Sequence, residues 1–178
     1  MNPVIGIDYS MSSPSICVHQ GNSWSFANCT FHFLSSKKKY IFSDNTFYGT
    51  AHQDFLNQEE RFNDIADWAV SKIPDASKIF LEGYAFGAKG VVFHIGECTG
   101  VLKHKLHQRG LVVDVVPPST IKKFATGKGN ANKVLMHEFF VKDVGLHLDK
   151  RFGCKIGDSP ISDIVDSYFI AKYAFSRV

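Results

Sequence analysis

The sequence of 178 residues has no long apolar run. No stretch approaches the roughly 18 consecutive apolar residues of a membrane-spanning helix, although 44% of the residues are hydrophobic and 13% are aromatic. The first ten residues, MNPVIGIDYS, contain neither a charged leading region nor a small-residue cleavage site, so we expect no signal peptide. This composition argues against a membrane protein and favours a globular domain with a hydrophobic core.

Cysteine is scarce, and its spacing matches no known cysteine framework. Cys17, Cys29, Cys98 and Cys154 include no CxxC pair, and no histidine lies at zinc-ligand spacing from them. The pattern argues against a disulfide scaffold and against a thiolate zinc site. It predicts reduced, mostly buried thiols in a cytosolic protein.

The chain also lacks internal repeats, low-complexity tracts and long Pro/Gly/Ser-rich linkers, which predicts one domain over residues 1–178. Its formal net charge of +3 says little about partners, but the charge is unevenly distributed. A basic stretch between Pro117 and Lys142 is opposed only by Glu138 and can contact phosphates; a solvated surface face is the alternative for any one lysine alone. The lysines of this stretch are Lys122, Lys123, Lys128, Lys133 and Lys142.

The spacing of apolar residues predicts a mixed α/β fold. Three antiparallel strands followed by alternating helices and strands are typical of a mixed five-stranded sheet flanked by helices. Residues 35–57 are polar and are expected to form a variable long loop or an extended hairpin. Strands are expected at 4–8, 15–20, 23–34, 78–82 and 111–116, and helices at 58–73, 90–109, 120–125, 131–144 and 160–176.

Smaller features refine three of the expected helices. Ser119 is a plausible N-cap for the helix at 120–125, and Pro160 stands where the last helix should begin. Gly96 and Gly100 lie four apart in the helix at 90–109, where each glycine costs about 1 kcal/mol relative to alanine. Two glycines on one face predict that the sheet or another subunit packs very close to them.

Four carboxylates are the strongest functional feature of the chain. Asp8 closes the apolar run at 4–7, Glu82 closes the run at 79–81, and Asp163 and Asp166 lie three apart at the start of the last helix. Ligands gather at the carboxyl ends of strands in such sheets, so the four can converge there.

Taken singly, Asp8 could be a strand-end turn residue, and Asp163 or Asp166 could complement a helix dipole. Together the four would repel one another unless divalent cations neutralised them. Two cations about 3.5–4 Å apart can activate a water and stabilise the leaving oxyanion during phosphodiester cleavage. The pattern therefore favours a two-metal phosphodiesterase site.

Four segments in this order resemble the RuvC-type Holliday junction resolvases of the RNase H-like superfamily. They are GIDYS with Asp8, FLEGYAF with Glu82, GKGNANK with Lys133, and DIVDSYFIA with Asp163 and Asp166. The fragment IGECTGVL is similar to a small-residue helix that lines the dimer interface in that family. The resemblance covers nearly the whole chain except residues 20–75. The turn after Asp8, Tyr-Ser-Met-Ser-Ser-Pro in place of the more usual Pro-Gly, is similar to that of divergent phage-type members.

The resemblance implies a fold, an activity and a partner. It implies an RNase H-like homodimer that binds four-way DNA junctions and nicks two opposed strands symmetrically, in the cytoplasm of a bacterium or of a phage-infected bacterium. Each site would hold two Mg²⁺ or Mn²⁺ ions, with Asp8 bridging both and Glu82, Asp163 and Asp166 completing the ligands. Lys133 would contact the scissile region.

The resemblance also implies a second functional lysine and an aromatic residue that contacts junction bases. Lys122 aligns with that lysine, and Lys123 beside it is the alternative. The family's aromatic position, three residues after the second acid, is Ala85 here, so its neighbours Tyr84 and Phe86 are the candidates. Both rings could instead anchor a loop or lie in the core.

Other polar groups have plainer interpretations. Lys37, Lys38 and Lys39 are interpreted as a solvated loop face, with DNA contact as the alternative; His94, His104 and His107 are interpreted as surface or interface residues. The same chemistry on flaps, forks, R-loops or RNA–DNA hybrids is an alternative function, and a catalytically silent binding module is a further one. An actin-like ATPase needs two domains, for which this chain is too short.

Overall fold

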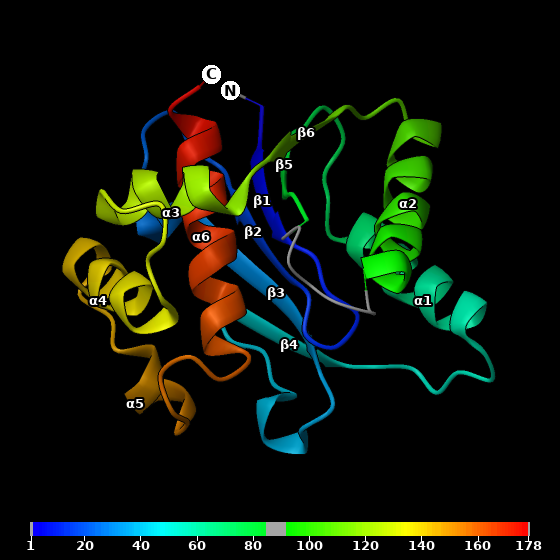
Figure 1. The fold of residues 1–178 in the computed structure, drawn as a ribbon, viewed down its shortest axis with the longest axis horizontal. Helices are drawn as coiled ribbons and strands as arrows, with labels where there is room; N and C mark the ends of the chain where they lie inside the picture. Colours follow the sequence, from blue (N-terminus) through cyan, green and yellow to red (C-terminus); the bar gives the residue numbers. More distant parts are fainter. Residues whose placement is uncertain (1, 85–91, 178) are drawn as a thin grey trace.

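The computed structural model describes residues 2–84 and 92–177 and contains one six-stranded sheet in the order β4-β3-β2-β1-β5-β6 (Figure 1). β2 is antiparallel to both of its neighbours, and the other neighbouring strands are parallel. Five strands therefore end at the same edge of the sheet, which we call the carboxyl edge. The strands are β1 (Val4–Asp8), β2 (Ser15–His19), β3 (Cys29–Ser35), β4 (Phe47–Ala51), β5 (Lys78–Glu82) and β6 (Val113–Val116).

Helices cover both faces of this sheet. α1 (Gln58–Ser71) and α2 (Val92–Gln108) lie on one face. The helices on the other face are α3 (Pro118–Thr126), α4 (Lys133–Val144), α5 (Leu148–Phe152) and α6 (Ile161–Phe175).

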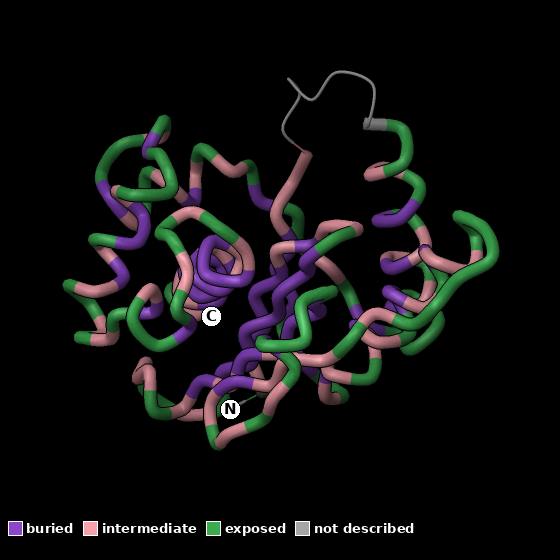
Figure 2. Tube along the Cα trace, turned by 90° about the horizontal axis from the view of Figure 1, so that it is seen from below, coloured by how far each residue is buried: buried purple, intermediate pink, exposed green. Residues whose placement is uncertain are grey.

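The central strand separates two hydrophobic cores. Ile5 and Ile7 of β1 pack with α1 and α2, whereas Val4 packs with α6 and its neighbours. Figure 2 shows that the middle of the sheet and the helix nearest the C-terminus, α6, are mostly buried. Burial on both faces explains why β1 and β5 are near-continuous apolar runs.

The prediction of five strands was one strand too few. All five are present, and β4 is a sixth, inside the segment expected to be a loop or hairpin. β4 pairs in parallel with β3, so the two do not form a hairpin. A Cβ added at Gly49 would lie 1.8 Å from the carbonyl oxygen of Tyr40, so glycine is needed there because the preceding chain folds closely over the strand.

The predicted helices are present, but two of their starts differ from expectation. Ser119 lies inside α3, whose N-cap is Pro117, because Pro118 already suits the first helical turn. Pro160 takes the N-cap position of α6 rather than its first helical position. α4 begins after Asn132, whose side chain accepts a hydrogen bond from the backbone N–H of Leu135 at 2.9 Å. The short helix α5 was not predicted.

The two glycines of α2 lie on an open face. A Cβ added at Gly96 or Gly100 would meet no described atom within 4 Å, so the prediction that the sheet packs there is wrong. Packing by another subunit stays a prediction. All four cysteines are free, and Cys17, Cys29 and Cys98 are buried as expected. Across residues 2–84 and 92–177, no helix combines the length and apolar character that a membrane span requires.

Candidate active site

Two of the four acids, Asp8 and Glu82, lie side by side at the carboxyl edge. β1 and β5 run parallel, with Ile7 paired to Leu81, so Asp8 and Glu82 are the next residues on neighbouring strands. Ile7 and Leu81 are 0% and 1% exposed. Both acids are half-buried, and each is held by a strand fixed in the core.

The other two acids come from α6, which crosses β1 at close range. A Cβ added at Gly6 would lie 2.3 Å from the carbonyl oxygen of Ser167, so only glycine allows this approach. The hydroxyls of Ser15 and Ser167 lie 3.0 Å apart, and Ser15 is the ladder partner of Asp8. Asp163 precedes Ser167 by about one turn and Asp166 precedes it directly, so both lie near the end of β1.

The acids influence one another electrostatically. Burial raises the pKa of Asp8 well above its ordinary value, and the charges of Glu82, Asp163 and Asp166 raise it further. Burial, then Glu82 and Asp163, raise the pKa of Asp166 to about 8. The pKa of Glu82 is also raised, chiefly by burial. The structure thus brings the four predicted acids into one cluster.

Two of the predicted lysines face this cluster. Lys122 lowers the pKa of Glu82 and Asp166, and Lys133 lowers that of Asp8 and Asp166, so both lie close enough to offset the repulsion. The ammonium of Lys133 donates to the carbonyl of Gly157 at 3.1 Å and to the hydroxyl of Ser162 at 3.3 Å.

The cluster suits a hard divalent cation but is not a finished ligand set. Within residues 2–84 and 92–177, no three His, Cys, Asp or Glu side chains are already arranged as a metal site. The acids nevertheless offer only oxygen donors, and Oδ2 of Asp163 is buried without a hydrogen-bond partner among the described residues. Burying charged carboxylates together is costly unless a cation compensates, and Mg²⁺ prefers such oxygen ligands. The residues present therefore fit the cations.

The remaining predicted contacts lie farther from the acids. Lys123 is exposed and lines a separate hollow beside Phe124, and Lys128 is exposed in the loop before α4. Tyr84 is partly exposed and lines an open groove of about 630 Å³ together with Pro117, Pro118 and Lys122. Phe86 lies outside the described residues.

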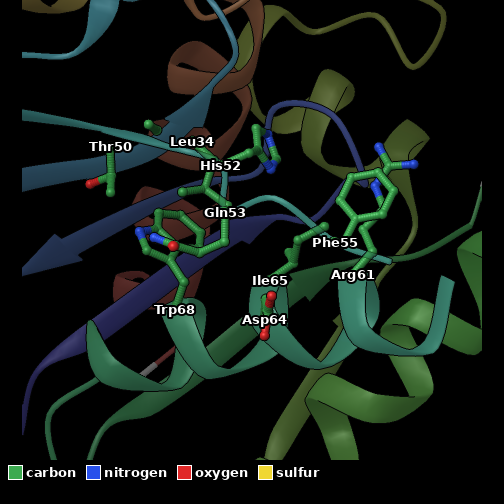
Figure 3. A pocket seen from close by; sticks show the side chains of 10 residues that line it. Leu34, Thr50, His52, Gln53, Phe55, Arg61, Asp64, Ile65 and Trp68 are labelled. Atoms are coloured by element: carbon green, nitrogen blue, oxygen red, sulfur yellow. The ribbon is translucent and has the colours of Figure 1, made fainter. Parts of the chain in front are cut away.

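Two side chains that no sequence pattern indicated contact the turn after Asp8. His52 Nε2 lies 2.8 Å from the carbonyl oxygen of Ser12, and Arg61 donates to the carbonyl of Met11 at 2.9 Å. Both residues line a small cavity of about 50 Å³ between α1 and the ends of β3 and β4, where Figure 3 shows Arg61 beside Phe55. Both bind backbone carbonyls, which no residue pattern reports.

The strand order, with acids at the carboxyl edge and on α6, defines an RNase H-like α/β fold. Within that class the structure is similar to RuvC of Thermus thermophilus, with a TM-score of 0.62, 15% identity, and coverage of 98% of this chain and 95% of that chain. A second similar structure is T. thermophilus RuvC in complex with Holliday junction substrate. Its TM-score is 0.62 and its sequence identity is 14%, and the match covers 99% of this chain and 96% of that chain. No family model and no curated protein matches the sequence. The chain therefore has a divergent RuvC-type fold.

Proposed function

We propose that this chain is a metal-dependent endonuclease that resolves four-way DNA junctions by paired, symmetric nicking. The observation that carries the proposal is the convergence of Asp8, Glu82, Asp163 and Asp166 at the carboxyl edge, with Lys122 and Lys133 facing them. The RuvC-type fold supports the choice of substrate, because one similar protein is in complex with a Holliday junction. Such an enzyme would work in the cytoplasm of a bacterium or of a phage-infected bacterium.

In this proposal the four acids hold two Mg²⁺ or Mn²⁺ ions per site. When bound, such ions supply an activated water and charge stabilisation for the leaving oxygen. The raised pKa values of Asp8, Glu82 and Asp166 mean that these acids carry protons more readily in the metal-free protein, so cation binding should release protons.

The lysines would position the substrate strand. Lys133 stands at the first position of α4, where Gly157 and Ser162 fix its ammonium beside Asp163. Lys122 approaches from α3 on the side of Glu82. A scissile phosphate seated over the acids would meet both ammonium groups, which offset the charge that develops during cleavage.

We further propose a homodimer, because paired nicking needs two sites of opposite orientation. The open face of α2 supports this arrangement: Phe93 is 81% exposed, and Gly96 and Gly100 present backbone with no described neighbour. In this proposal the same face of a second copy packs on α2 across a two-fold axis.

A panel of labelled DNAs tests the substrate. The purified protein is incubated in Mg²⁺ with a four-way junction, a flap, a fork, an R-loop, an RNA–DNA hybrid and a linear duplex, and the nicks are mapped on each strand. Paired symmetric nicks confined to the junction support the resolvase. Equal or better cutting of flaps, forks, R-loops or hybrids would favour the alternative substrates, and binding without cutting would favour a silent module.

A further inference from the structure

Three consecutive lysines are presented on a short turn after β3. Lys37, Lys38 and Lys39 are all exposed, and the last two belong to the 3₁₀ helix η2 (Lys38–Tyr40). Tyr40, which follows directly, is only 1% exposed, and its ring lies 6.0 Å from that of Phe152 of α5. The turn is therefore anchored in the hydrophobic core by its fourth residue.

Local contacts fix the lysines further. The backbone N–H of Lys37 donates to the hydroxyl of Ser35 at 3.1 Å, and that of Tyr40 donates to the carbonyl of Lys37 at 2.9 Å. The ammonium groups of Lys37 and Lys39 lie 5.9 Å and 4.7 Å from the centre of the Tyr40 ring. Lys39 also donates to the carbonyl of Gly153 at 3.4 Å. A loop that only needs to be soluble requires no such ordering of lysine side chains.

The turn lies at the same edge of the sheet as the acids. β3 runs parallel to β1, and the ladder aligns Asp8, Ser15 and Phe33 in one row. Neighbouring strands are about 4.8 Å apart, so the turn begins roughly 10–20 Å from Asp8. That span is comparable to the major groove of B-DNA, which is about 12 Å wide. One DNA arm could therefore contact the turn and the acids together.

A fourth lysine joins the three. Lys155 is exposed in the loop between α5 and α6, two residues after the Gly153 that Lys39 contacts; Figure 1 shows this loop at the same end of the molecule as the turn after β3. Among the described residues, none of these four lysines forms an ion pair with a carboxylate. Asp158, which is exposed, acts on Lys39 electrostatically but forms no ion pair with it. In the described part of the chain, the four ammonium groups thus have no carboxylate that neutralises them in an ion pair.

We propose that Lys37, Lys38, Lys39 and Lys155 form a phosphate-binding surface, the lysine clamp, which holds the backbone of a DNA arm leaving the active site on the β3 side. The inference rests on the proposed function. Lys122 and Lys133 contact the strand at the acids from the α3–α4 side, and the lysine clamp contacts the arm beyond it. Three of the four clamp lysines lie in the segment 20–75, which the resemblance in sequence does not cover.

The test compares two triple variants that lose the same charge. Lys37→Ala/Lys38→Ala/Lys39→Ala removes the three positive charges from the turn after β3. Lys72→Ala/Lys78→Ala/Arg177→Ala removes three cations near the opposite edge, where α1 and α6 end and β5 begins. Junction affinity is measured by fluorescence anisotropy over a range of salt, in an Asp8→Asn background that prevents cutting. Each phosphate contact contributes about 0.9 to the slope of log affinity against log salt.

For the clamp variant we expect a loss of about ten-fold or more in junction affinity at ~0.1 M salt and a slope lower by about 2–3. The control triple should change affinity by less than about two-fold. Both variants should melt close to the parent, because Lys72 is only partly buried and the other five replaced side chains are exposed. Shortening the junction arms should weaken binding by the parent much more than binding by the clamp variant, because the variant has lost three of the four lysines that hold the distal phosphates.

An unchanged salt slope, or an equal loss in the control triple, would overturn the lysine clamp. Either result could occur in an enzyme that still cuts junctions, and it would then leave the proposed function intact. A wild-type protein that neither binds nor cuts branched DNA would instead contradict the proposed function.

Discussion

At the scale of single residues, Asp166 shows how the acid cluster lowers the stability of the metal-free protein. Burial and the charges of Glu82 and Asp163 raise its pKa to about 8, whereas the unfolded chain ionises near the ordinary value of 3.8. Between these two values the folded protein binds the proton more tightly than the unfolded chain. The stability of the metal-free protein should therefore fall as the pH rises through this window.

Asp166→Asn should accordingly stabilise the metal-free protein at pH 8, by about 1–3 kcal/mol or ~2–8 °C in Tm. Below about pH 4 the gain should vanish, because the carboxyl is protonated in both states. Thermal unfolding in EDTA at both pH values measures this, and Asp158→Asn, an exposed acid, is the control. A lower Tm for Asp166→Asn at pH 8 would contradict the described cluster.

Mg²⁺ should offset the repulsion among the acids and so stabilise the folded protein. A ligand that binds only the folded state raises Tm, so adding Mg²⁺ at pH 8 should stabilise the wild type. Asp166→Asn should respond much less, because it lacks one proposed ligand. Equal stabilisation of both proteins, measured in the same melts, would place the ion elsewhere.

Lys133 allows a second test at this scale. Its ammonium is fixed by Gly157 and Ser162 beside the acids, so Lys133→Ala should lower turnover by about 10-fold or more and junction affinity by less than about 3-fold. Lys123→Ala is the matched control, because Lys123 is exposed and lies away from the acids. Single-turnover cleavage and anisotropy separate the two quantities; a proportional loss of both would make Lys133 a phosphate-binding residue only.

At the scale of elements, the open face of α2 leads to a prediction about assembly. Gly100→Leu places a bulky side chain where no described atom lies within 4 Å, so the folded monomer should tolerate it. Replacing a helical glycine should even stabilise the helix by up to about 1 kcal/mol. The same side chain would block close approach by a second copy.

We therefore expect Gly100→Leu to be monomeric by light scattering at micromolar concentration, with an unchanged or higher Tm, and to lose paired nicking. Glu138→Leu, at an exposed position of α4, is the control and should stay dimeric. A dimeric Gly100→Leu protein that nicks in pairs would mean that α2 does not form the interface.

The elements also show how far sequence patterns reach. β1, β5 and α1 were predictable because burial on one or both faces leaves apolar runs and helical spacing. β4 was not, because it is short and contains Gly49, which is required by the close passage of residues 40–42. The acids were predictable because each strand acid interrupts a buried run, whereas His52 and Arg61 contact backbone carbonyls and leave no pattern.

At the scale of the whole molecule, the net charge is only +3, but the acidic and basic side chains are separated along one edge of the sheet. The acids lie at the carboxyl edge, Lys122 and Lys133 approach them from α3 and α4, and the lysine clamp lies on the far side of β2. This arrangement can attract DNA across one edge while the protein stays near neutral. The acids would determine the cut, and the flanking cations would determine which DNA reaches it.

The most direct measurement is cleavage of a labelled four-way junction by the wild type and by Asp8→Asn, with binding measured in parallel. We expect paired nicks at symmetric positions for the wild type, only when Mg²⁺ or Mn²⁺ is present. For Asp8→Asn we expect a loss of cutting of at least about 10³-fold with junction affinity retained, because a proposed metal ligand is removed and the fold is kept. Undiminished cutting by Asp8→Asn, or cutting by the wild type in EDTA, would mean that the four acids are not a metal-dependent nuclease site.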